Sequence, residues 1–71
     1  MKTLYITSEP RGAFYSAMDD ADKGDRIVYH IGEHCGGPHR KDASDASDRN
    51  ACFLFCRRLG EGVFEYLAVK R

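Results

Sequence analysis

Tryptophan is absent from this 71-residue chain, proline occurs only twice, and no apolar run exceeds a handful of residues. We therefore expect neither a membrane span nor a signal peptide. The chain also has no net charge, since 11 basic residues balance 11 acidic ones, whereas nucleic-acid-binding proteins usually have a basic excess. A chain this short buries little surface. We expect a single domain over residues 1–71, with no small-molecule substrate and no enzymatic activity.

Cysteine is also scarce, with three residues in the chain. An odd number does not fit a closed set of disulfides, and Cys52 and Cys56 lie in an apolar run, where cysteine usually acts as a small buried hydrophobic residue. The pattern predicts reduced thiols and a cytoplasmic protein.

All three histidines fall within residues 30–41, HIGEHCGGPHRK. His30, His34, Cys35 and His39 are potential zinc ligands, but their spacing lacks the close ligand pairs typical of zinc sites. Cys35 lies beside His34 and His39, but no third group that would orient a catalytic base for a cysteine nucleophile can be identified. We therefore expect no metal and no cofactor, with His30 partly buried and with His34 and His39 in solvent.

Residues 8–24 have the apolar spacing of a helix, because apolar side chains recur at i, i+3, i+4 and i+7. The stripe consists of Phe14, Ala17, Met18 and Ala21. Ser8 is the expected N-cap and Gly24 the expected end of this helix.

The other segments predict strands over residues 3–7 and 25–32, a weak second helix over 38–50, and a hairpin of strands 51–58 and 63–69. The order strand, helix, strand, helix, hairpin indicates an α+β fold. A winged-helix-like domain has this order and would use the second helix for recognition. The alternative is a small antiparallel sheet with one or two helices packed on one face.

Two segments carry a resemblance to known proteins, GDRIVYHIG at residues 24–32 and FCRRLGEGVFEYLAVKR at residues 55–71. They resemble a group of small phage- and prophage-encoded proteins with a GDRIVYH-type strand and a C-terminal RR-G-F-Y-A-R hairpin. The resemblance covers residues 24–71 apart from the linker and the second helix. It implies a phage protein acting in the bacterial cytoplasm, and the group has no assigned activity.

The charges are unevenly distributed along the chain. Residues 1–25 hold three basic and five acidic residues, whereas residues 51–71 hold four basic and two acidic residues. Arginines near a hairpin tip commonly contact DNA phosphates or the minor groove, and cations at a helix start favour anions. The leading hypothesis is a non-enzymatic regulatory protein that binds nucleic acid through Arg40, Lys41, Arg57, Arg58, Lys70 and Arg71.

An acidic surface supports a second hypothesis, the inhibition or modulation of a host machine such as the transcription or defence apparatus. Carboxylates can imitate phosphates for a basic host protein, and those on the second helix would repel DNA. The candidate residues are Asp19, Asp20, Asp22, Asp42, Asp45 and Asp48. The expected partner is thus nucleic acid or a host protein, with no membrane partner. Tyr5 on a short edge strand leaves room for a homodimer.

Overall fold

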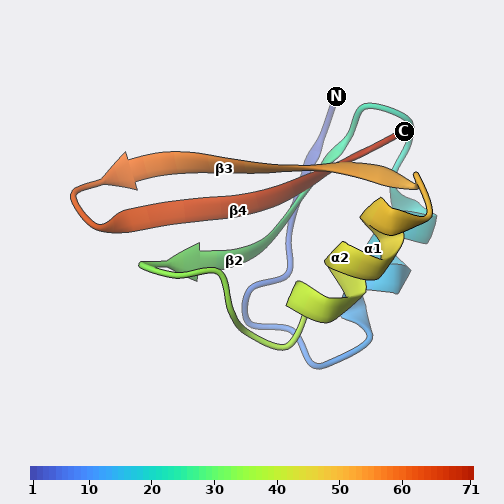
Figure 1. Cartoon of the computed structure of the whole chain (residues 1–71). Coiled ribbons are helices and arrows are strands. Elements are labelled where there is room, and N and C mark those ends of the chain that lie inside the picture. The colour runs from blue at the N-terminus through green and yellow to red at the C-terminus, as the bar shows by residue number, and fades with distance from the viewer.

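Four strands form one mixed sheet, and two helices pack against one of its faces (Figure 1). The computed structural model describes all 71 residues. The strands are β1 (Thr3–Tyr5), β2 (Arg26–Gly32), β3 (Cys52–Gly60) and β4 (Val63–Lys70), and the helices are α1 (Ala13–Asp20) and α2 (Arg40–Asp48). The strand order is β1-β2-β4-β3, with β1 parallel to β2 and the other neighbours antiparallel. The predicted α+β class and element order are confirmed.

Helix α1 is shorter than predicted, because its N-cap is Gly12 in place of Ser8 and it ends at Asp20, before Gly24. Two consecutive turns precede it, closed by hydrogen bonds from Glu9 N to Ile6 O and from Ala13 N to Pro10 O. Gly12 then adopts a left-handed conformation with φ of 97°, which glycine tolerates and other residues rarely adopt. Ser8 is therefore not the N-cap. The predicted apolar stripe is nevertheless confirmed, because all four of its residues are buried.

Strand β2 contains a bulge between Val28 and His30, which changes the predicted alternation of its side chains. Up to Tyr29 the odd-numbered residues point to the helices. After the bulge, His30 pairs with Tyr66 and Ile31 pairs with Glu65. Ile31 therefore lies on the helix-free face and is 40% exposed, although strict alternation along the strand would place it on the same face as Tyr29.

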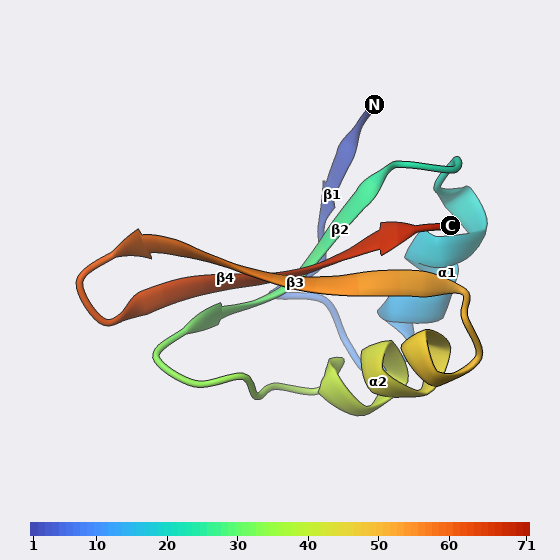
Figure 2. The same ribbon diagram turned by 45° about the horizontal axis from the view of Figure 1, so that its top comes forward.

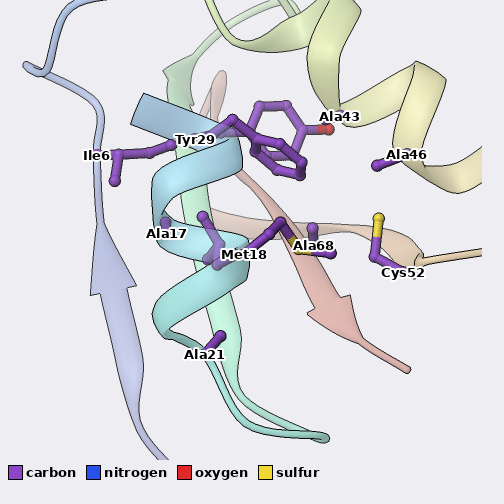
Figure 3. Packing of buried hydrophobic residues seen from close by; sticks show 11 residues of the cluster. Ile6, Ala17, Met18, Ala21, Tyr29, Ala43, Ala46, Cys52 and Ala68 are labelled. Atoms are coloured by element: carbon purple, nitrogen blue, oxygen red, sulfur yellow. The ribbon is translucent and has the colours of Figure 1, made fainter. Parts of the chain in front are cut away.

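The hydrophobic core lies between the two helices and the sheet (Figure 3). Phe14 from α1 is fully buried and meets the ring of Tyr29 edge-on at 6.1 Å between centroids. Helix α2 contributes only Ala43 and Ala46, so this helix can approach the sheet closely. The core is small, a cluster of 11 buried residues on the helix side of the sheet.

The β3–β4 hairpin extends past the helices, and its tip is far from both of them (Figures 1 and 2). β3 ends at Gly60 and β4 begins at Val63, so the turn between them consists of Glu61 and Gly62.

Neither α1 nor α2 has the length and apolar composition needed to cross a membrane.

Candidate functional site

The helix-free face of the sheet carries three rows of paired residues. The first row is Thr3, Arg26, Val69 and Phe53; the second is Tyr5, Val28, Leu67 and Phe55; the third is Ile31, Glu65 and Arg57. Residues in one row lie on neighbouring strands and point to the same side of the sheet. We call this surface the open face, because the core and both helices lie on the other side.

Two phenylalanines dominate the β3 side of the open face. Phe53 is 49% exposed and Phe55 is 53% exposed, and their ring centroids are 6.4 Å apart. Phenylalanine side chains are usually buried in a folded protein, and a pair of exposed rings on one strand is a typical feature of a binding surface. The rings therefore form the most distinctive apolar group on the surface of the chain.

Two arginines flank these rings. The guanidinium of Arg71 lies 4.4 Å from the centre of the Phe53 ring, a cation–π arrangement, and Nη1 donates to Oδ1 of Asn50 at 3.2 Å. Toward the hairpin tip, Nη2 of Arg57 lies 3.3 Å from Oε1 of Glu65. The Glu65 side chain is 8% exposed and the Arg57 side chain is 63% exposed, so a buried carboxylate is paired with a guanidinium that remains largely in solvent.

Arg58 is on the opposite face of β3 from Arg57, in the row with Phe64 and Gly32. Its Nε donates to the carbonyl oxygen of Gly60 at 3.1 Å. The two arginines that the sequence placed together at the hairpin tip are therefore separated by the thickness of the sheet.

The other predicted cations lie elsewhere. Arg40 and Lys41 line a hollow of about 370 Å³ at the start of α2, together with Gly37, Ser44 and Asp45, whose carboxylate is on the same surface. Lys70 is half-buried, and its amine donates to the carbonyl oxygens of Met18 at 2.6 Å and Ala21 at 2.8 Å. This amine lies at the C-terminal end of α1, where the last carbonyl groups of a helix lack partners within the helix.

The predicted acidic residues lie on the helix side of the molecule. Asp19 and Asp20 belong to α1, Asp22 follows it, and Asp42, Asp45 and Asp48 belong to α2; all are exposed except Asp42, which is half-buried. Asp25 belongs to the same acidic N-terminal stretch, but it is buried and has a structural role. Its buried carboxylate accepts hydrogen bonds from the backbone amides of Lys2 and Asp22 at 2.9 and 2.8 Å, and these bonds lower the pKa of Asp25.

The histidines of residues 30–41 do not converge. His39 is fully buried at the N-cap of α2 with Nε2 at 3.2 Å from the carbonyl oxygen of Glu9, so its predicted exposure to solvent is wrong. The cause is the turn at residues 6–9, which folds over the start of α2. His30 is half-buried against the ring of Tyr66, with centroids 5.9 Å apart. No three histidine, cysteine or acidic side chains are arranged to hold a metal ion.

Cys35 lies beside the helix-side face of the sheet, with Sγ 4.0 Å from the hydroxyl of Tyr29. Burial, and then the neighbouring Cys35, raise the pKa of Tyr29 far above its ordinary value. Burial also raises the pKa of the Cys52 thiol. The Tyr29 hydroxyl and the Cys52 thiol therefore stay protonated and neutral at physiological pH, and neither has the lowered pKa of a reactive nucleophile.

The largest hollow in the molecule, about 600 Å³, is a groove between β1 and α1. It is lined by residues of β1 and by both acidic and basic residues, among them Glu9, Arg11 and Asp20. This mixed charge does not favour a particular ligand.

Comparisons with protein-family models, with curated proteins and with solved structures find no match for this chain.

Proposed function

We propose that this chain binds single-stranded nucleic acid on the open face of its sheet, with bases stacked on Phe53 and Phe55. The single observation that carries the proposal is the pair of half-exposed rings flanked by two arginines. Aromatic rings on an open sheet can accept unpaired bases because every base has a flat π-face, and each stack contributes about 1–3 kcal/mol. We infer a non-enzymatic regulatory role in a bacterial cytoplasm, in keeping with the phage resemblance.

The cations of the open face support the same ligand. Arg26 lies in the row with Phe53, and Arg57 and Arg71 lie at the two ends of the exposed β3 segment. Glu65 is the one acidic residue in the three rows, and its carboxylate forms a salt bridge with Arg57. A backbone that runs along β3 would therefore meet positive charge at both ends while its bases lie over the rings.

The winged-helix mode of binding uses α2 as the recognition helix in a duplex groove. Ala43 and Ala46 turn one side of α2 to the core, which leaves Asp45 and Asp48 on its exposed side. Carboxylates on that surface repel a phosphate backbone. We therefore favour the open face over α2, and single strands over duplex DNA.

The test is the binding of a labelled oligothymidylate of about 16 nucleotides, titrated at several salt concentrations beside a duplex of the same length. Tighter binding of the single strand is expected. Each phosphate contact contributes about −0.7 to the slope of log K against log salt for single strands. Arg71→Gln should make the slope of log K against log salt less negative by about 0.7, whereas the control Arg40→Gln should leave this slope unchanged. Preference for duplex, or dependence on Arg40 and not on Arg71, would contradict the proposal.

Arg57 needs a paired variant, because its removal alone would leave the buried carboxylate of Glu65 without a partner. The double variant Arg57→Gln with Glu65→Gln removes both charges while both side chains keep hydrogen-bonding groups. We expect this double variant to remain folded and to bind with one phosphate contact fewer, which makes the slope of log K against log salt less negative by about 0.7.

A protein partner remains the second candidate, because five of the six predicted aspartates are exposed on the helix side, away from the open face. This surface suits a basic host protein. Capture from a bacterial lysate by the wild-type chain, but not by a variant with Asp45→Asn and Asp48→Asn, would support it. Equal recovery of a partner by both chains would contradict it.

A further inference from the structure

The outer edge of β3 has no partner strand. β3 and β1 are the two edges of the sheet, and β3 has nine residues whereas β1 has three. Natural edge strands are usually protected from pairing by charges, proline, bulges or short length. Residues 52–56, Cys-Phe-Leu-Phe-Cys, contain no charge and no proline, and the irregularity in β3 lies beyond them, between Arg58 and Gly60. The unpaired N–H and C=O groups of this segment are therefore available to another strand.

The segment reads the same in both directions about Leu54. We propose that two copies of this chain pair through β3 in antiparallel orientation, with Leu54 on the two-fold axis. In this register Leu54 faces its own copy, Phe53 faces Phe55 of the second copy, and Cys52 faces Cys56. Every apolar side chain then meets one of its own kind. Aromatic and apolar cross-strand pairs of this sort stabilise antiparallel sheets.

The register also determines which residues meet beyond the paired segment. The antiparallel register brings the hairpin tip of one copy alongside residues 48–51 of the other. Arg58, on the helix side of the sheet, then lies opposite Asn50, next to the C-terminal end of α2. That end carries the exposed carboxylate of Asp48 beside Arg49, which is the C-cap of α2. The carbonyl oxygens of residues 45–47 already accept backbone hydrogen bonds. The register also separates Arg57 and Arg58 of one copy from those of the other.

This pairing would extend the open face. A two-fold axis perpendicular to the sheet leaves the helices of both copies on the same side, so the two open faces form one surface. Four phenylalanines, two from each copy, would lie in adjacent strands. The inference does not depend on the proposed function, and it is tested in the absence of nucleic acid, so either can fail alone.

The mass of the full chain in solution is the first test, measured by sedimentation over a range of concentrations under reducing conditions. We expect reversible doubling of the mass as the concentration rises. Leu54→Lys should give a monomer, because two lysines would meet on the axis. The control is Val63→Lys, since Val63 is similarly exposed (39% against 38%) but lies on β4, which has partners on both sides. A monomer at every concentration, or a Leu54→Lys dimer, would overturn the proposal.

Crosslinking tests the register without relying on a disruptive variant. In a background with Cys35→Ser, Cys52→Ala and Cys56→Ser, the variant Leu54→Cys should oxidise to a covalent dimer, because paired Cα atoms lie about 4.5–5.5 Å apart, within disulfide range. Phe53→Cys alone should crosslink poorly, but a mixture with Phe55→Cys should crosslink well. Efficient self-crosslinking of Phe55→Cys in place of Leu54→Cys would refute the register.

Discussion

Removal of the Lys70 amine should destabilise the protein without weakening its interaction with nucleic acid. The amine is held by the carbonyl oxygens of Met18 and Ala21, at 2.6 and 2.8 Å, across 52 and 49 residues of sequence. The last turn of α1 has no basic residue of its own. Lys70 therefore provides, from β4, the positive charge that favours a helix C-terminus.

The magnitude follows from these contacts. Hydrogen bonds that involve a charged group contribute about 1.5–3 kcal/mol when buried, and less at a half-exposed site such as this one. We expect Lys70→Met, which keeps the apolar stem, to lower the free energy of unfolding by about 2 kcal/mol. In a domain of this size, that change lowers the melting temperature by about 8–16 °C.

The assay is urea or thermal unfolding followed by circular dichroism, with Lys23→Met as the matched control. Lys23 is exposed and makes no side-chain hydrogen bond, so its variant should stay within about 0.5 kcal/mol of the wild type. If Lys70→Met were no less stable than Lys23→Met, the proposed support of α1 by β4 would be refuted. If Lys70→Met were stable but bound oligothymidylate less tightly, Lys70 would be a binding residue.

Three further predictions concern single residues. The pKa of Asp25 is lowered from 3.8, so its contribution to stability is present above pH 3.8 and is lost as the pH falls through the lower folded-state pKa; unfolding from pH 7 to 2 should show this loss in the wild type and not in Asp25→Asn. Gly37 has φ of 80°, and an added Cβ would lie 2.9 Å from Nδ1 of His30. Gly37→Ala should therefore lower the free energy of unfolding in urea by about 1–3 kcal/mol. The control Gly36→Ala, whose added Cβ would have its nearest contact at 3.9 Å, should lower it by less than about 1 kcal/mol. Phe14→Ala should cost about 3–5 kcal/mol and leave the chain largely unfolded by circular dichroism, and a cooperative native transition in this variant would contradict the assigned core.

Local patterns in the sequence predicted the elements and the apolar stripe of α1, because side-chain periodicity depends only on nearby residues. The predicted start of α1 was wrong because Ser8 and Pro10 suit a helix start, whereas hydrogen bonds from Glu9 to Ile6 and from Ala13 to Pro10 fold the same residues into turns. The bulge in β2 has no local signal in the sequence. It becomes visible only from the pairing of His30 with Tyr66 on β4.

The candidate site was predicted in part. Alternation showed that Phe53 and Phe55 share a face of β3, but which face the helices cover depends on tertiary packing. One signal was available, since the hairpin has apolar residues on both faces and two short helices cannot cover both. The role of Lys70 could not be predicted, because the carbonyl oxygens it contacts lie about 50 residues away in the chain.

The central claim is that exposed rings on the open face bind unpaired bases, and the affinity of Phe55→Leu for oligothymidylate tests it most directly. Leucine keeps an apolar side chain on β3 but removes the ring. A lost stack of about 1–3 kcal/mol corresponds to about 5- to 140-fold weaker binding. The control is Tyr15→Leu, because Tyr15 is an aromatic residue on the helix side with 38% exposure. The proposal predicts weaker binding for Phe55→Leu alone; unchanged affinity in Phe55→Leu, or equal loss in both variants, would contradict it.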